Sequence, residues 1–253
     1  MYSFVHWLQA KPASVQLRMR NKAKMKRFSL AFVPSVGAVV SLGIEESRHL
    51  AARRVEVGES VELLSPDGTV STGELVSRKP YEVRITDIVA PVASHPLTIC
   101  VALPQANRAS TMVEKCTEIG VGRIQPIICR RGVAIPRSGD ALIERWGRVA
   151  MAAAKQSGAQ VPTILPPLPF DRVIRLPGQS VVLSPEGEQS LGDFLDARTT
   201  DEVSIFVGPE GGFSTEEIAV AREAGVTLCS MGRTILRVET AAIVACALYA
   251  ERL

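Results

Sequence analysis

The chain has 253 residues, of which 46% are hydrophobic and 22% are charged, and its formal net charge at pH 7 is +3. This composition is typical of a globular protein with one large core or two modest ones, and it excludes a disordered, collagen-like or disulfide-stapled chain. No apolar run approaches the ~18 residues that a membrane-spanning helix requires, so we expect no membrane association. The five cysteines form no CxxC pair, which disfavours zinc and disulfides and favours a reducing, cytoplasmic compartment.

Residues 1–25 are interpreted as a basic N-terminal extension. Seven lysines and arginines precede the first acidic residue, Glu45. Such a stretch can contact phosphate groups, but it can equally be a solvated tail without a specific role. It also resembles an organelle transit peptide, although residues 2–9 predict no convincing amphipathic helix. A third alternative is that translation begins at Met25.

Residues 26–92 are predicted to form a small β-barrel or meander. Short alternating segments with the period of strands lie at 38–42, 60–64, 69–76 and 81–89. Turn residues such as Pro66-Asp67-Gly68 separate them. One short helix is expected at 45–54. The proline-containing stretch 90–96 is the candidate linker to a second domain.

Residues 97–253 show a different pattern, in which continuous apolar runs alternate with helical periodicity. Strands are expected at 97–103, 124–129, 180–183, 203–207 and 227–229. The clearest helices are expected at 110–119, 140–157, 215–224 and 239–252. Solidly apolar strands that alternate with helices indicate an α/β fold, with a parallel sheet covered on both faces.

Two of these strands run directly into the same Pro-Glu-Gly turn, at 185–187 and at 209–211. Ligands of open parallel sheets bind outside the carboxyl ends of the strands, where glycines let backbone amides approach a small molecule. We therefore expect both turns to face one crevice. The alternative is that proline and glycine merely end the strands. Ser214 and Glu217, which follow the second turn, form a capping box that begins a helix and has a structural role.

The most informative segment is 230–242, in which Arg233 and Arg237 flank an apolar pair. This arrangement suits an aromatic base held between aliphatic side chains while backbone groups contact its edge. Glu239 lies where the last helix begins, and a favourable interaction with the helix dipole is its simplest explanation. Arg130 and Arg131 follow a strand end and are candidates for phosphate contacts.

Several familiar motifs are missing from the sequence. It contains no GxGxxG, GxxxxGK[ST], HExxH or GxSxG pattern, and its three histidines have no metal-ligand spacing. These observations disfavour a polyphosphate ligand, a catalytic metal and a covalent intermediate.

Two stretches, GPEGGFSTEEI at 208–218 and MGRTILRVETA at 231–241, resemble the paired signature of the RsmE family of ribosomal RNA methyltransferases, within the SPOUT superfamily. The stretches at 112–127 and 144–158 are also similar to family sequences. The resemblance covers roughly residues 26–252. It departs from the family pattern at Ala159, where an arginine is usual.

This resemblance implies a PUA-like N-terminal barrel that helps to hold RNA, and a C-terminal domain, 97–253, with a deep trefoil knot. It also implies a homodimer that uses S-adenosylmethionine to methylate N3 of a specific uridine in 16S ribosomal RNA, within the assembled small subunit. The rival functions are a SPOUT methyltransferase that acts on a different RNA position, and a non-catalytic RNA-binding assembly factor with the same fold.

The resemblance and the residue chemistry together give three sets of candidate site residues, and no metal ligand. The catalytic candidates are Arg237, which can stabilise negative charge on the base, and the two carboxylates that can take the N3 proton, Glu239 and Glu210. The implied cofactor pocket is lined by Leu183, Gly208, Pro209, Glu210, Gly211, Gly212, Met231, Gly232, Ile235, Leu236, Arg237 and Thr240. The candidate RNA contacts are Arg27, Arg53, Arg54, Arg130 and Arg131.

Overall fold

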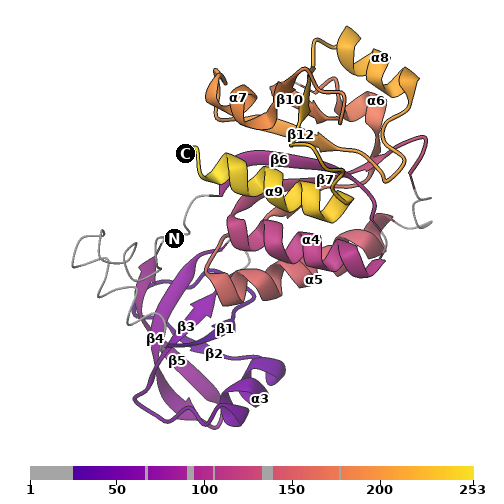
Figure 1. The fold of residues 1–253 in the computed structure, drawn as a ribbon. Helices are drawn as coiled ribbons and strands as arrows, with labels where there is room; N and C mark the ends of the chain where they lie inside the picture. Colours follow the sequence, from indigo (N-terminus) through magenta and orange to yellow (C-terminus); the bar gives the residue numbers. More distant parts are fainter. Residues whose placement is uncertain (1–24, 66–67, 90–93, 105, 133–138, 177) are drawn as a thin grey trace. The chain divides into compact units, whose positions relative to one another are not determined.

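A computed structural model of the chain describes residues 25–65, 68–89, 94–104, 106–132, 139–176 and 178–253. The predicted basic extension, except for Met25, and most of the predicted linker lie outside these residues. The chain divides into two compact units, residues 1–90 and 91–253 (Figure 1). Within the described ranges, no helix combines the length and the apolar character needed to cross a membrane.

The first unit contains a five-stranded sheet and one helix. The strands, in the sheet order β1-β3-β4-β5-β2, are β1 (Lys26–Ser29), β3 (Ser60–Leu64), β4 (Val70–Arg78), β5 (Tyr81–Val89) and β2 (Val39–Ser41). The helix is α3 (Ile44–Ala52). Four strands and the helix confirm the predicted elements to within about two residues. The prediction missed β1, which pairs in parallel with β3.

Alternate residues of these strands form the core of the first unit. Val83 and Ile85 on β5 are buried, as the period of two predicts, and they pack with Phe28 of β1. A buried carboxylate, Glu62, lies on the opposite face of β3 from the core residues Val61 and Leu63, and it accepts a 2.6 Å hydrogen bond from Nη2 of Arg27. The Arg27 side chain is only 13% exposed, so the geometry favours a structural role over the RNA contact expected from sequence.

The second unit contains an eight-stranded sheet in which all strand pairs are parallel, and this confirms the predicted α/β class. Its strands are β6 (His95–Ala102), β7 (Val121–Ile128), β8 (Thr163–Ile164), β9 (Leu168–Pro169), β10 (Gln179–Leu183), β11 (Gln189–Ser190), β12 (Val203–Val207) and β13 (Thr227–Ser230). Their order is β11-β13-β10-β12-β6-β7-β8, and β9 pairs with β7. The prediction missed β8, β9 and β11, because two residues are too few to show a period.

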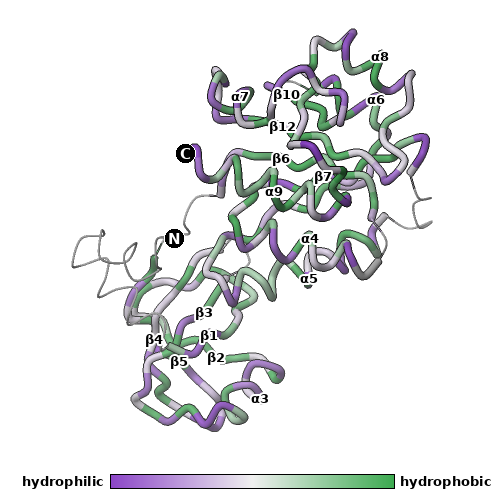
Figure 2. Tube along the Cα trace, viewed as in Figure 1, coloured by the Kyte–Doolittle hydropathy of each residue, from purple (hydrophilic) through white to green (hydrophobic). Residues whose placement is uncertain are grey.

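Helices cover both faces of this sheet, as the apolar strands predict (Figure 1). They are α4 (Ala106–Ile119), α5 (Gly139–Ser157), α6 (Phe170–Val173), α7 (Leu191–Asp196), α8 (Thr215–Glu223) and α9 (Val238–Ala250). Figure 2 shows the apolar character of β6 and β12 at the centre of the sheet. On β6, Ile99 packs into the same core as Trp146 of α5, whereas Cys100 packs into the opposite core with Phe170 of α6. Helix α4 begins one turn before its predicted start, and this places Arg108 on the helix.

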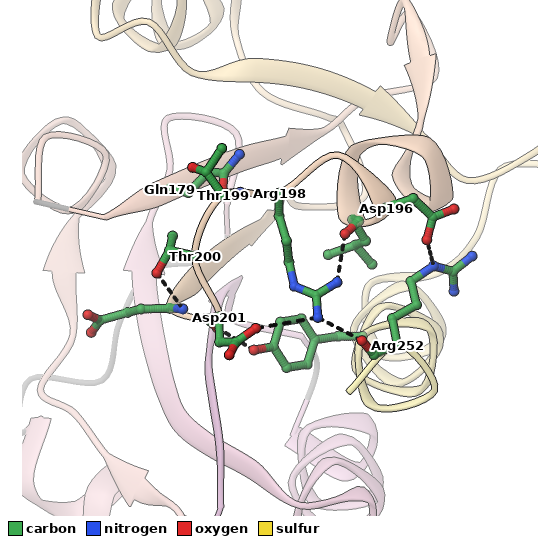
Figure 3. A network of polar contacts seen from close by, with 10 residues as sticks. Gln179, Asp196, Arg198, Thr199, Thr200, Asp201 and Arg252 are labelled. Carbon is green, nitrogen blue, oxygen red and sulfur yellow. Dashed lines mark hydrogen bonds and ion pairs between the residues drawn. The ribbon is translucent and has the colours of Figure 1, made fainter.

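A polar network anchors the carboxyl end of α9 (Figure 3). Arg198 donates a 2.6 Å hydrogen bond to the carbonyl oxygen of Leu195 and a 2.7 Å bond to that of Arg252. Its guanidinium also lies 5.4 Å from the centre of the Tyr249 ring, and the Tyr249 hydroxyl donates to the carbonyl of Asp201. These contacts tie the helix to the segment between α7 and β12. They therefore fix the axis of α9, whose amino end borders the candidate site.

Candidate functional site

A cavity of about 860 Å³ lies at the carboxyl ends of β10, β12 and β13. Residues of both Pro-Glu-Gly turns line it, among them Pro185, Glu186, Pro209 and Glu210. Its volume is in the range of small-molecule sites, and its position is the one expected for ligands of open parallel sheets. The structure thus brings the two turns to one crevice, as the sequence predicts.

The structure also brings together most of the residues proposed from sequence for cofactor binding. Those that line the cavity are Leu183, Gly208, Pro209, Glu210, Gly211, Gly212, Met231, Gly232, Ile235 and Leu236. The other two, Arg237 and Thr240, do not line it, and both are exposed where α9 begins. Arg131, Arg222 and Arg233 add positive charge to the cavity wall.

The loop between β12 and α8, residues 208–213, is called the glycine loop below. Its backbone closes on itself, since the N–H of Gly212 donates a 2.8 Å hydrogen bond to the carbonyl of Pro209. Gly212 has φ +69°, a left-handed conformation that favours glycine. A Cβ at Gly208 would lie 2.9 Å from the ring of Phe213, so this glycine allows the ring to fold over the backbone.

The predicted capping box at the start of α8 is confirmed. Ser214 Oγ accepts a 3.2 Å hydrogen bond from the N–H of Glu217, and Glu217 Oε2 accepts a 2.7 Å bond from the N–H of Ser214. The other carboxylate oxygen, Oε1, accepts a 2.9 Å bond from the N–H of Arg130. Glu217 is buried, so one carboxylate joins the end of the glycine loop to the end of β7. The sequence predicts the box but gives no sign of the Arg130 contact.

The candidate RNA contacts occupy different surroundings. Arg131 lines the cavity and donates a 3.0 Å hydrogen bond from Nη1 to the carbonyl of Gly211, so it also supports the glycine loop. Arg130 is exposed and lies 3.5 Å from the carboxylate of Glu216. In the first unit, the candidates Arg53 and Arg54 are exposed, and the guanidinium of Arg53 lies 5.8 Å from the ring centre of Phe28.

The first Pro-Glu-Gly turn packs directly against β13. The N–H of Ser184 donates a 2.9 Å hydrogen bond to the carbonyl of Cys229, and the N–H of Gly187 donates a 3.0 Å bond to the carbonyl of Ser184. A Cβ at Gly187 would lie only 2.2 Å from the backbone carbon of Cys229. Gly187 is therefore required for this close approach of two backbone segments, which the sequence analysis did not predict.

Residues 231–236, called the arginine segment below, form the opposite wall. Met231 and Leu236 pack partly against the core, whereas Ile235 is 85% exposed although it lines the cavity. Within the described parts of the chain, no hydrogen bond or ion pair joins residues 231–236 to their surroundings. Arg237, which follows, is the N-cap of α9 and is exposed.

The two candidate carboxylates, Glu210 and Glu239, share a cation that the sequence analysis missed. Arg108 on α4 places Nη1 4.0 Å from Oε1 of Glu210 and Nε 3.7 Å from Oε1 of Glu239. The Glu239 side chain is 12% exposed, whereas that of Glu210 is 45% exposed. No local pattern distinguishes Arg108 from a surface arginine, because its partners are about one hundred residues away or more along the chain.

The cysteines of the second unit have the properties of core residues. Burial raises the pKa of the Cys129 thiol to about 12 and that of the Cys229 thiol to about 11, so both thiols are neutral near pH 7. Neutral thiols are poor nucleophiles. Among the residues that the structure describes, no group of three or more histidine, cysteine, aspartate or glutamate side chains could hold a metal ion.

Comparisons with known proteins point to one family. The family model for an RNA methyltransferase domain matches residues 92–250. Ribosomal RNA small subunit methyltransferase E of Mycobacterium bovis is 30% identical over 239 residues, which span 86% of this chain and 88% of that protein. The protein of the same name from Synechocystis is 26% identical over 251 residues, with 93% of this chain and 82% of that protein covered.

A solved structure gives the same result for the fold. The ribosomal RNA small subunit methyltransferase E of Neisseria gonorrhoeae, bound to S-adenosylmethionine, superposes with a TM-score of 0.78 at 29% identity, over 88% of this chain and 95% of that one. The mostly parallel α/β sheet is thus shared with that structure. The chain therefore belongs to the ribosomal RNA small subunit methyltransferase E family of RNA methyltransferases.

Proposed function

We propose that this protein transfers a methyl group from S-adenosylmethionine to N3 of a specific uridine in 16S ribosomal RNA. The observation that carries the proposal is that both signature segments, the glycine loop and the arginine segment, line one cavity at the carboxyl edge of the parallel sheet. The names of the related proteins and the cofactor bound to the Neisseria gonorrhoeae enzyme support it. A family relationship alone would not be enough to support this function, since one fold can host several functions.

The residues of the cavity fit the proposed cofactor. The glycine loop exposes backbone without side chains, and Gly187 and Gly208 allow close packing at positions where a Cβ would collide with Cys229 or Phe213. Apolar side chains suit an adenine ring, and they include Leu183, Val207 and Leu236. The bound cofactor supplies a methyl group that is already activated by a sulfonium. The protein then has to orient the two reactants and handle one proton.

Uridine N3 carries a proton and normally faces its base-pairing partner. The base must therefore be unpaired or flipped out before reaction, at a cost of a few kcal/mol. Exposed arginines, including Arg53, Arg54 and Arg130, offset this cost through contacts with phosphates. When N3 loses its proton, the neighbouring carbonyl oxygens gain negative charge, which Arg237 stabilises in this proposal. Arg237 is exposed and has no ion-pair partner among the described residues.

The finer architecture is part of the same proposal. The first unit corresponds to a PUA-like barrel that holds RNA, and its five-stranded sheet with a separate core is consistent with this assignment. The end of the second unit threads through a trefoil knot. Support comes from the sheet order, in which β13 lies beside β10 while the following helix α9 packs on α4 and β6. The protein acts as a homodimer, which sedimentation equilibrium can test.

Transfer of a labelled methyl group tests the function. We expect tritium from labelled S-adenosylmethionine to enter 16S ribosomal RNA when assembled small subunits are supplied, and to enter free RNA more slowly. Digestion and mass spectrometry should identify 3-methyluridine. Another methylated nucleoside would indicate a different target, and calorimetry without cofactor binding would indicate a non-catalytic assembly factor.

A further inference from the structure

Arg108 lies between two carboxylates that come from different elements of the second unit. Glu210 belongs to the glycine loop and lines the cavity, and Glu239 belongs to the first turn of α9. The distances of 4.0 Å and 3.7 Å are those of ion pairs, and they exceed the 2.7–2.9 Å typical of a direct charge-assisted hydrogen bond. One guanidinium therefore forms an ion pair with each carboxylate and a short hydrogen bond with neither.

The two carboxylates differ in how firmly they are held. Glu210 is 45% exposed on a loop, where water can solvate its charge. Glu239 is 12% exposed on a helix, and its Oε2 is buried without a hydrogen-bond partner in the described part of the chain. A buried carboxylate is costly unless a cation or donors compensate it. Arg108 is the cation within ion-pair distance of Glu239 among the described residues, so the charge and orientation of Glu239 depend on it.

We propose that Arg108 is a positioning residue that holds Glu239 as the acceptor of the uridine N3 proton, an inference that rests on the proposed function. In this step the N3–H bond breaks and its electron pair stays on nitrogen, while the proton forms an O–H bond with the Glu239 carboxylate. Glu239 later releases the proton to water. Glu210 is the second partner of Arg108, and it links this arrangement to the glycine loop.

A positioning role and a cofactor-binding role predict different kinetics. Arg108 and Glu239 do not line the cavity, so their loss should lower kcat and leave the KM for S-adenosylmethionine almost unchanged. We expect Arg108→Gln to lower kcat about 100-fold, and the KM for the cofactor to change by less than about threefold. Arg108→Lys keeps the charge but loses the planar guanidinium that reaches two carboxylates. Its kcat should therefore be about tenfold higher than that of Arg108→Gln.

A double-mutant cycle tests whether Arg108 acts through Glu239. If it does, Arg108→Gln should have little further effect once Glu239→Gln has removed the acceptor, and the double variant should match Glu239→Gln within about threefold. The control is Arg123→Gln, which breaks an exposed ion pair with Glu202 at the amino ends of β7 and β12, whereas the cavity lies at the carboxyl ends of the strands. It should keep wild-type kcat.

Thermal unfolding supplies a readout that does not depend on activity. Arg108→Gln should lower Tm by about 2–4 °C in the wild-type background, and by less in the Glu239→Gln background, where no buried charge needs compensation. The inference is overturned if Arg108→Gln keeps wild-type kcat, or if the kcat of Arg108→Lys is no higher than that of Arg108→Gln. It is also overturned if the effects of Arg108→Gln and Glu239→Gln are additive both in kcat and in Tm. Wild-type protein that binds cofactor but leaves RNA unmethylated would contradict the proposed function first, and this inference with it.

Discussion

The two walls of the cavity are built in opposite ways. The glycine loop is framed by hydrogen bonds from its own backbone, from Arg131 and from the capping box of α8. The arginine segment makes no hydrogen bond or ion pair within the described residues, and it leaves Ile235 exposed to solvent. One wall is therefore held by hydrogen bonds, whereas the other is held by the packing of Met231 and Leu236 and presents exposed side chains to a ligand.

This difference has an energetic consequence. An organised wall loses little conformational entropy when a ligand binds, whereas each side chain that becomes fixed on the other wall costs about 0.5–1.5 kcal/mol. Mutations in the frame of the glycine loop should therefore reduce stability, and mutations in the arginine segment should reduce binding while stability is kept. The following substitutions test this contrast.

The largest effect is expected where the first Pro-Glu-Gly turn meets β13. In Gly187→Ala, the added Cβ would lie 2.2 Å from the backbone carbon of Cys229, so the turn must move away from the strand that leads into the arginine segment. We expect the free energy of unfolding in urea to fall by about 3 kcal/mol, and the calorimetric affinity for S-adenosylmethionine to fall about tenfold. Gly147→Ala on α5 is the control, because its Cβ would meet no atom within 4 Å. Equal stability of the two variants would contradict the close approach.

The next effect concerns the carboxylate that frames the glycine loop. Glu217→Gln replaces one acceptor oxygen by an amide that faces a backbone N–H, so one of the bonds to Ser214 and Arg130 is lost in a buried position. The free energy of unfolding in urea should therefore fall by about 2 kcal/mol. Glu223→Gln, at the exposed end of the same helix, should change stability by less than about 0.5 kcal/mol. If both variants were equally stable, the frame would not depend on the carboxylate.

A smaller loss is expected when only the cap is removed. Ser214→Ala leaves the N–H of Glu217 without its acceptor at the start of α8, and this should cost about 1 kcal/mol in urea unfolding. Ser214→Thr keeps a hydroxyl at the N-cap and should recover most of that stability. A threonine variant as unstable as the alanine variant would show that the loss has another cause.

The smallest effect on stability is expected in the arginine segment. Ile235→Ala removes a side chain that is 85% exposed, so the free energy of unfolding should change by less than about 0.5 kcal/mol. Calorimetry should nevertheless show cofactor affinity reduced about fivefold, because the bound ligand would bury about 40 Å² less apolar surface. Ile44→Ala in the first unit is a matched control, since Ile44 is 77% exposed and should leave both quantities unchanged. Unchanged affinity in Ile235→Ala would indicate that this wall does not close on the ligand.

Local patterns predicted much of the fold and of the cavity. The alternation in β5, the solid apolar runs of β6 and β12 and the capping box at Ser214 each depend on neighbours within a few residues, so the sequence displays them directly. The same holds for the two Pro-Glu-Gly turns, because the carboxyl ends of parallel strands must meet at one edge of a sheet. Elements of two residues, such as β8 and β11, are too short to be recognised in this way.

Local sequence patterns and the family resemblance were therefore enough to predict the α/β class, the family and most of the residues that line the cavity. They did not predict which charged side chains meet. Arg108 lies beside Glu239, Arg27 is bound to buried Glu62, and Arg237 lies outside the cavity lining. An ion pair depends on how elements that are distant in the sequence pack together. Long charged side chains follow no periodic pattern along the chain from which their partners could be identified.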